Sequence, residues 1–189
     1  MIIDVFPFFN ETELVELRCE LLKDVVDLHI AVAATHTYQG DKIPTPRFSL
    51  WDTMPTGNLF VNSIDASGEF ASAWEREKYQ RQMIREVIAG HASDDDLIIY
   101  TDADEIPNPE ILANEEYRQF LMAELEVHPI QGLEMRVFYY GTQLEDPAPI
   151  DRPKVGYWGA MKSRDWDELR WERYDPDRIL TDAGWHISY

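Results

Sequence analysis

The sequence of 189 residues predicts an α/β fold with a mostly parallel central sheet flanked by helices. A strand, a helix and a second strand follow one another within about 35 residues, as in a parallel sheet with right-handed crossovers. A later apolar run, residues 97–101, stops abruptly at a group of carboxylates. Because 44% of the residues are apolar, a chain of this length can bury a good core as one domain.

The first β-α-β unit is expected at the amino terminus. Residues 1–9 form its first strand, which ends at Asn10, a good helix-capping residue with Glu13 three positions later as in a capping box. Apolar side chains at helical spacing predict a helix over 11–24, and a second strand follows at 28–34.

The middle of the chain continues the alternation of strands and helices. Residues 35–57 are rich in Pro and Gly and are expected to form a long loop, of the kind that is usually functional or mobile. A third strand is predicted at 58–64, and a helix over 71–89 that Gly90 ends. The fourth, central strand is predicted at 97–101.

The last part of the chain is less regular. A helix in two pieces is expected over 107–126, with the break near Asn114, and strands at 132–140 and, shorter, at 157–161. The tail is rich in Trp, Arg and Asp, which is unusual for a simple solvated terminus.

The charge limits the partners. The formal net charge is −19, and binding to the phosphates of nucleic acid relies on Lys and Arg, so a nucleic-acid partner is not expected. A small anionic donor held through a metal remains compatible with this charge.

The cysteine content and the amino terminus indicate the compartment. The single cysteine, Cys19, cannot form an internal disulfide and is expected to be a buried thiol in a reducing compartment. The amino terminus lacks the basic region of a secretory signal, and no apolar run approaches the roughly 20 residues of a membrane span. We therefore expect a soluble, cytoplasmic protein with no membrane span.

The acidic motif after residues 97–101 is the sharpest chemical signal. Asp102, Asp104 and Glu105 follow the end of the strand, and ligands of open α/β sheets bind at that edge. Carboxylates there, together with substrate phosphates, suit Mg²⁺ or Mn²⁺. The alternative is a solvated acidic turn with Pro107 opening the next helix.

The helix over 71–89 carries a group of cations. Arg76, Glu77 and Gln80 lie within one turn of each other, and Arg81 and Arg85 form a second row at i, i+4 spacing. Arginine forks match phosphate oxygens, so the group can face a diphosphate. Salt bridges along a solvated face are the alternative.

Histidines and aromatic residues offer further candidates. His186, in a predicted loop, is a third metal ligand or a packed histidine, and His36 lies at the ligand edge as a ligand or as a hydrogen-bonded loop residue. Tyr139, Tyr140 and Trp158 can stack on a sugar or a base, or pack in the core. The glycine-rich fingerprints of dinucleotide-binding and P-loop proteins and the nucleophile elbow are missing from the sequence.

Six segments together carry a resemblance to a known family. They are residues 4–11 with Leu14 and Arg18, 34–37, 74–77 with Gln80 and Arg81, 94–97, 102–107 and 184–189. In this order they resemble family 17 glycosyltransferases, the group of the bisecting β-1,4-mannosyl-glycoprotein β-1,4-N-acetylglucosaminyltransferases, over nearly the whole chain.

The resemblance implies a GT-A-like, Rossmann-type fold in one domain, with a nucleotide-sugar-binding half over 1–107 and an acceptor-side half over 108–189. It implies an inverting transfer from a nucleotide-diphosphate sugar, UDP-N-acetylglucosamine or a related UDP-sugar, to a hydroxyl of a glycan or glycolipid. Mn²⁺ or Mg²⁺ on Asp102 and Asp104, with His186 as a third ligand, would neutralise the diphosphate leaving group.

The resemblance also implies which residues contact the donor. They are Asn10, Glu11, Thr35, His36, Arg76, Gln80, Arg81, Asp102 and Trp185. Among them, Arg76 and Arg81 would lie near the diphosphate, and Trp185 or else Tyr140 near the sugar. Inversion needs a carboxylate base on the acceptor hydroxyl. The candidates for that base are Glu105, Glu134, Asp165 and Asp182, of which Glu105 and Asp182 are retained as catalytic residues.

Two departures from the family qualify this interpretation. Ala33 stands at the end of the second strand, where members commonly carry an acid that could read the base or ribose. The sequence also stops at Tyr189, where relatives continue, so we expect either a minimal version or a missing carboxyl-terminal part. The acceptor is expected to be a glycolipid, a polysaccharide precursor or a small glycoside rather than a secreted glycoprotein.

Two other functions stay open. An Asp-dependent phosphohydrolase would use Asp102 as nucleophile and Asp104 as acid and base, but the motif follows the fourth strand rather than the first. A non-catalytic module that binds a nucleotide sugar or a sugar would keep the fold without the transfer.

Overall fold

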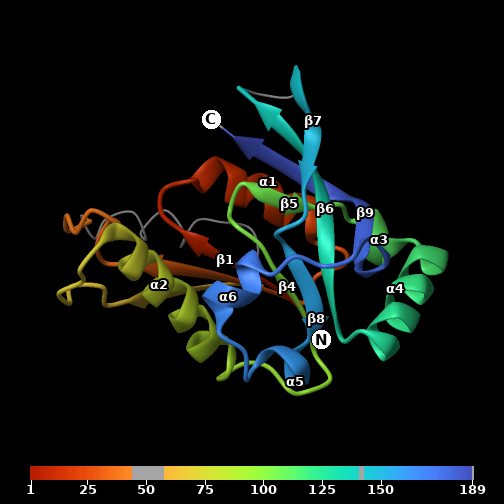
Figure 1. Cartoon of the computed structure of the whole chain (residues 1–189), viewed down its shortest axis with the longest axis horizontal. Helices are drawn as coiled ribbons and strands as arrows, with labels where there is room; N and C mark the ends of the chain where they lie inside the picture. The colour runs from red at the N-terminus through yellow and green to blue at the C-terminus, as the bar shows by residue number, and fades with distance from the viewer. Residues whose placement is uncertain (44–57, 141–142, 189) are drawn as a thin grey trace.

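The first half of the chain forms a parallel sheet. In the computed structural model, which describes residues 1–43, 58–140 and 143–188, four parallel strands lie in the order β3-β2-β1-β4. Their bounds are Ile2–Phe8 for β1, Leu28–Ala34 for β2, Leu59–Ile64 for β3 and Leu97–Tyr100 for β4. All four were predicted within two residues. The apolar runs of β1, β2 and β4 are buried because helices cover both faces of the sheet, whereas β3 at the edge is mostly half-buried or exposed (Figure 1).

The second half continues the sheet with mixed pairing. Beyond β4 the order is β8-β6-β9-β5, and β7 pairs with β6 outside this path. The bounds are Glu105–Pro107 for β5, Ile130–Tyr139 for β6, Leu144–Ile150 for β7, Lys154–Tyr157 for β8 and Ile179–Ser188 for β9. Only β6 and β9 pair in parallel here. The predicted mostly parallel sheet is therefore right for β1–β4 and wrong for the rest, and the fold is mixed α/β.

The helices confirm part of the prediction and correct three details. Their bounds are Thr12–Leu22 for α1, Ala73–Ile88 for α2, Glu110–Ala113 for α3, Glu115–Val127 for α4, Trp158–Met161 for α5 and Trp166–Trp171 for α6, followed by a 3₁₀ turn at Pro176–Arg178. The break at Asn114 is confirmed, since its side chain caps α4.

The corrections have local causes. Glu11, not Asn10, is the N-cap residue of α1, and its carboxylate accepts the backbone N–H groups of Phe9 and Asn10 instead of capping the helix. The strand predicted at 157–161 is the helix α5, preceded by β8. The tail predicted as a loop is the long strand β9. Most of the predicted loop, residues 44–57, lies outside the described residues.

The core is divided by the sheet. One face buries β1, β2 and β4 side chains against α2, α5 and α6, with Ile84 and Trp166 among the residues that no solvent reaches. The other face packs β4, β6 and β8 against α3 and α4, with Leu121 fully buried. Cys19, on the inner face of α1, is buried, as expected.

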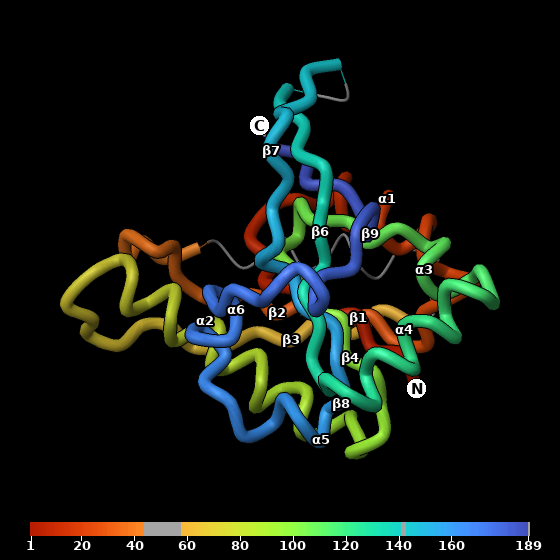
Figure 2. The backbone as a smooth tube through the Cα atoms, turned by 45° about the vertical axis from the view of Figure 1, so that its right-hand side comes forward, coloured from red at the N-terminus to blue at the C-terminus, as the bar shows by residue number. Residues whose placement is uncertain are grey.

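The direction of the strands decides where a site can form. β6 is antiparallel to β8 and β8 to β4, so β6 runs in the same direction as β1, β2 and β4. Their carboxyl ends therefore meet at one edge, and the ends of β6, β7 and β9 extend beyond the body as an arm (Figure 2). In the described part of the chain, no helix is both long and apolar enough to cross a membrane.

Candidate functional site

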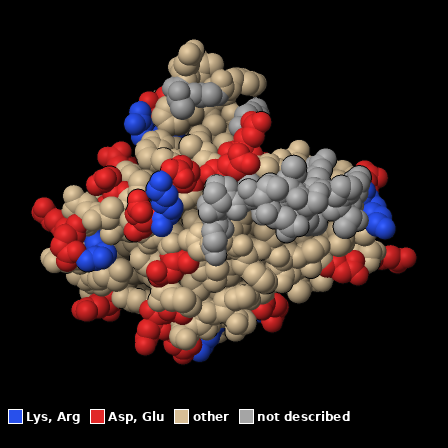
Figure 3. All heavy atoms as spheres, turned by 180° about the vertical axis from the view of Figure 1, so that it is seen from behind, with Lys and Arg blue, Asp and Glu red and all other residues tan. Residues whose placement is uncertain are grey.

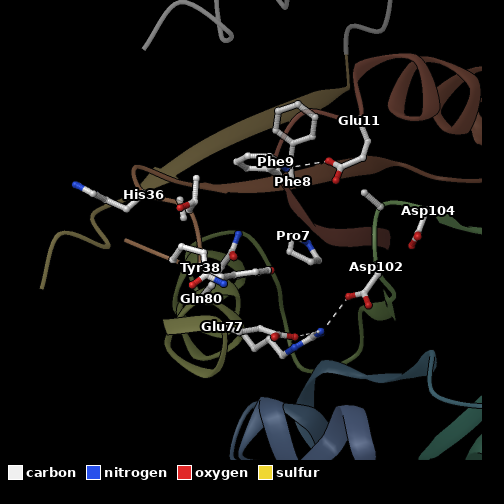
Figure 4. A pocket seen from close by; sticks show the side chains of 15 residues that line it. Pro7, Phe8, Phe9, Glu11, His36, Tyr38, Glu77, Gln80, Asp102 and Asp104 are labelled. Atoms are coloured by element: carbon white, nitrogen blue, oxygen red, sulfur yellow. Dashed lines mark hydrogen bonds and ion pairs between the residues drawn. The ribbon is translucent and has the colours of Figure 1, made fainter. Parts of the chain in front are cut away.

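A cavity of about 450 Å³ lies at the carboxyl ends of β1, β2 and β4. Its lining residues are Pro7, Phe8, Phe9, Glu11, Ala34, His36, Thr37, Tyr38, Gln39, Glu77, Gln80, Arg81, Asp102, Ala103 and Asp104. Figure 4 shows Asp102 and Asp104 entering from one loop, with His36 and Tyr38 across from them. The predicted ligand edge is thus a formed cavity that combines aromatic walls with four carboxylates.

Asp102 is held by two arginines. Its Oδ1 accepts a hydrogen bond from Arg81 Nη1 at 3.0 Å, and its Oδ2 accepts one from Arg170 Nη2 at 3.0 Å. Burial raises the pKa of Asp102, but the Arg170 and Arg81 guanidinium groups outweigh burial and hold that pKa well below its usual range. Asp102 is therefore ionised, with both carboxylate oxygens already engaged.

Glu105 lies beneath Asp102 and is almost fully buried, with 1% of its surface exposed. Its carboxylate accepts the backbone N–H of Asp102 at 2.7 Å and forms an ion pair with Arg170. Arg170, from α6, was not identified from the sequence, because a lone arginine in a short helix gives no sign of its long-range partners.

Arg18 fixes the acidic turn, which we define as residues 101–105, from below. Its guanidinium binds Asp4 through two nitrogens, donates to the Thr101 hydroxyl, and donates to the backbone carbonyls of Asp102 at 3.2 Å and Glu105 at 2.7 Å. These bonds use all five N–H groups of the side chain.

Asp4 completes this buried cluster. His29 Nδ1 lies 2.8 Å from its Oδ2. Burial raises the pKa of Asp4, but the charge and hydrogen bonds of Arg18 and His29 overcome burial and lower it to about 2. The acidic turn thus rests on an ionised carboxylate that solvent does not reach.

Asp104 faces a different environment. Strand β9 pairs with β5 so that His186 lies opposite Glu105, and the Ile187 N–H donates to the Asp104 carbonyl at 2.8 Å. This brings His186 Nδ1 within 3.6 Å of Asp104 Oδ1. Burial raises the pKa of Asp104 to about 6, against the opposing effect of His186, and the charges of Glu105 and Asp102 add to the rise.

The donor set of Asp104 and His186 fits a divalent cation that also takes ligands from a substrate. His186 Nδ1 is buried, has no hydrogen-bond partner among the described residues, and lies 3.6 Å from Asp104 Oδ1 and 3.8 Å from Glu105 Oε1. No group of three or more His, Cys, Asp and Glu side chains in the described ranges could hold a metal by itself. Mg²⁺ and Mn²⁺ sites commonly combine one or two carboxylates with substrate phosphates, which this pair permits.

Several predicted donor contacts are brought together in the cavity. Glu11, His36, Gln80, Arg81 and Asp102 all line it. Gln80 is nearly buried and donates to the Val32 carbonyl at 3.1 Å, which ties α2 to the end of β2.

Four predicted contacts do not line the cavity, and three of them, Arg76, Thr35 and Asn10, lie in neighbouring segments. Arg76 donates to the Tyr38 carbonyl at 2.8 Å and so ties α2 to the loop after β2. The Thr35 hydroxyl accepts the Ala66 N–H at 3.0 Å, and Asn10 is exposed beside the start of α1. Arg76 and Thr35 therefore hold together segments beside the cavity, but none of the three residues lines it.

Other predicted residues lie elsewhere. Neighbouring residues of a strand point to opposite faces, so Trp185 faces away from His186. Asp182 is exposed outside the cavity, where its carbonyl accepts Asn108 Nδ2. Ala33 is buried in the core beside Phe6, and it is Ala34 that reaches the cavity.

Two further base candidates also lie outside the cavity lining. Asp165 caps α6 and pairs with Lys78, and Glu134 is half-buried on β6. With Glu105 buried in ion pairs, the lining carboxylates are Glu11, Glu77, Asp102 and Asp104.

A family comparison now identifies the chain. The sequence model of glycosyltransferase family 17 matches residues 1–189. The chain belongs to glycosyltransferase family 17. The resemblance carried by the six segments is thereby confirmed, and the acidic turn lies within the matched residues.

Among solved structures, the family 17 chain is similar to the crystal structure of S. aureus TarS 1–349, with a TM-score of 0.52 over 99% of this chain. The two sequences are 12% identical, so the likeness concerns the fold alone. The family 17 chain spans 60% of the TarS chain. No curated protein sequence matches it.

Proposed function

We propose that this family 17 chain transfers a sugar from a nucleotide-diphosphate donor to a hydroxyl acceptor, with inversion and with a GT-A-like donor site. The observation that carries the proposal is the cavity at the strand ends, whose lining residue Asp104 lies 3.6 Å from Nδ1 of His186. His186 does not itself line the cavity and comes from a segment far away in the sequence. A UDP-sugar such as UDP-N-acetylglucosamine is the donor expected from the family.

Charge supports a metal-dependent donor. The described lining carries four carboxylates and one guanidinium, that of Arg81, so a free diphosphate would be repelled. When bound to Asp104 and His186, Mn²⁺ or Mg²⁺ would supply a Lewis acid that neutralises the diphosphate as it leaves. Arg81 would add a cationic contact beside it.

The other residues have positioning roles in this proposal. Glu105 orients the Asp102 backbone and Arg170, and Asp102 holds Arg81, so neither has to coordinate the cation. The exposed face of Phe9 and the ring of Tyr38 offer flat surfaces for the nucleoside. Asp182 has no role here because it lies outside the cavity.

The phosphohydrolase alternative is weakened by the same geometry. A nucleophilic Asp102 needs a free oxygen, whereas each oxygen of this carboxylate accepts a hydrogen bond from an arginine. Experiment distinguishes a non-catalytic binding module from a transferase, since the module would bind the donor without turning it over.

Calorimetric titration of a panel of nucleotide sugars, with and without Mn²⁺, tests the proposal. We expect one nucleotide sugar to bind only with the cation, and we expect slow release of free sugar or transfer to a saccharide. Binding that EDTA leaves unchanged would contradict the metal site, and tight binding without any turnover would favour the binding module. Phosphate release from p-nitrophenyl phosphate would revive the hydrolase.

A further inference from the structure

We propose that one face of the arm, formed by Tyr139, Leu144, Ser188 and Asp146, binds an uncharged oligosaccharide as the acceptor. This inference rests on the proposed function and adds the location and chemistry of the acceptor surface. We define the arm as residues 135–140, 144–150 and 184–188 of β6, β7 and β9.

The register of the arm sets which side chains share a face. Val137 lies opposite His186, and two residues further along Tyr139 lies opposite Ser188. Paired residues of neighbouring strands point to the same face, and so do residues two apart in one strand. Tyr139 and Ser188 therefore lie on the face of His186, about 7 Å beyond it along the strands.

Strand β7 widens the same face. Tyr139 pairs with Leu144, and Val137 pairs with Asp146. The side chains of Tyr139 and Leu144 thus form a cross-strand pair. Asp146 lies in the row below them, the row of Val137 and His186. The surface begins beside the Asp104–His186 pair and continues outward, where a second substrate would meet the donor sugar.

Exposure and chemistry point to a sugar. Tyr139 is 41% exposed and Leu144 is 59% exposed, although both are large apolar side chains. A flat aromatic ring beside a few polar groups, here a hydroxyl and a carboxylate, is the combination that binds the C–H face and the hydroxyls of a saccharide.

Charge argues for an uncharged saccharide. The formal net charge is −19, and acidic side chains are spread over the surface seen in Figure 3, so a polyanionic acceptor would be repelled. On the opposite face of the arm, Arg136 and Glu145 neutralise each other in a two-bond ion pair at 2.7 and 2.8 Å. The described arm therefore offers no cationic surface for a polyanion.

A second copy of the chain is a less suitable occupant. β7 pairs with β6 on one side, and among the described residues its other edge carries Pro147 and Pro149. Proline has no N–H group and blocks the addition of another strand. The face of the arm, rather than its edge, is left for binding.

The test measures binding of chitotriose and mannotriose by saturation-transfer NMR and calorimetry, with UDP and Mn²⁺ present. Heparin hexasaccharide is the polyanionic comparison. We expect the wild type to bind at least one neutral trisaccharide, Tyr139→Ala to bind it about tenfold more weakly, and Tyr139→Phe to keep most of the affinity. Phe120→Ala, which removes an aromatic ring 54% exposed on α4, is the matched control and should be unaffected.

Each other outcome bears on the proposal. Leu144→Ser provides a second variant if Tyr139→Ala does not fold, with the same expected direction. The proposal is overturned if neither neutral trisaccharide binds the wild type, if Tyr139→Ala or its substitute Leu144→Ser binds as well as wild type, or if heparin binds instead. Loss of a dimer in the variant, seen by analytical ultracentrifugation, also overturns it. UDP binding is read in the same samples, so failure of the donor site is seen separately.

Discussion

The two sides of the acidic turn differ although they carry the same residue type two positions apart. Asp102 accepts hydrogen bonds from Arg81 and Arg170. Asp104 is partly desolvated, and its nearest cationic candidate is His186, 3.6 Å away. The difference teaches that an Asp-x-Asp motif divides its work: one carboxylate anchors the turn, and the other stays available for a ligand.

The largest expected effect is a loss of folding stability when Arg170, the partner of Asp102 and Glu105, is replaced. Replacing Arg170 by Met leaves the buried Glu105 carboxylate with the Asp102 N–H and, 3.8 Å away, His186 Nδ1. Breaking a buried ion pair in this way costs about 3–5 kcal/mol. Urea denaturation measures the loss. Arg118→Met removes an arginine whose side chain is 46% exposed and should change stability by less than about 0.5 kcal/mol. A similar small change for Arg170→Met would mean that the anchor is not structural.

The next effect contrasts the two carboxylates directly. Asp104→Asn should weaken Mn²⁺-dependent nucleotide-sugar binding about 100-fold, equivalent to about 2.7 kcal/mol, with little change in melting temperature. Asp102→Asn should instead lower the melting temperature, because Arg81 and Arg170 each lose one of their charged partners. Calorimetry and thermal unfolding of both variants test the contrast, with the exposed Asp24→Asn as control. The division of work fails if the two variants exchange these effects.

At acid pH the protein should lose the stability that the buried Asp4 carboxylate contributes beneath the acidic turn. The pKa of Asp4 is lowered from 3.8 to about 2, so its contribution to stability is fully present above pH 4 and is lost as the pH falls toward 2. The difference corresponds to about 2 kcal/mol. Unfolding free energies measured between pH 2 and pH 5 should fall in the wild type and depend less on pH in Asp4→Asn. Equal slopes for the two proteins would argue against this role of Asp4.

The smallest effect is expected at His186. His186→Ala removes one nitrogen ligand, and Mn²⁺ affinity should fall about tenfold, since Asp104 and the donor phosphates remain. Manganese titration followed by electron paramagnetic resonance, with nucleotide present, measures it. His128→Ala, at the end of α4, serves as the control. An unchanged titration would make His186 a packing residue.

Local signals explain which strands the sequence predicts. β1, β2 and β4 are mainly apolar runs, interrupted only by the buried pair Asp4 and His29 and by Pro7, as is typical of buried parallel strands. β7 contains two prolines and two acids, and β5 has only three residues, so neither has the pattern of a strand. Both are strands because they pair with β6 and β9, and that pairing is set by tertiary structure.

The residues of the candidate site divide in the same way, into those that the local sequence marks and those that only the tertiary structure places. Asp102, Asp104 and Arg81 were predicted because motif and spacing mark them, and His186 because a histidine in the tail can be a third metal ligand. Arg170 and the orientation of Trp185 depend on how α6 and β9 pack, which residue spacing does not encode. The proposed acceptor face likewise depends on the register of three strands.

The position of β9 has a consequence for the order of folding. β9 lies between β6 and β5 in the sheet, and it joins Asp104 to a residue 82 positions later in the chain. The strands β1–β4 all lie within the first 100 residues, so they can pair before β9 has been synthesised. A nascent chain would thus form the cavity at the ends of β1, β2 and β4 before His186 reaches Asp104. Under the proposed function, Mn²⁺ would bind only after β9 has joined the sheet. The bound metal would then stabilise the insertion of β9 and slow the unfolding of the folded protein.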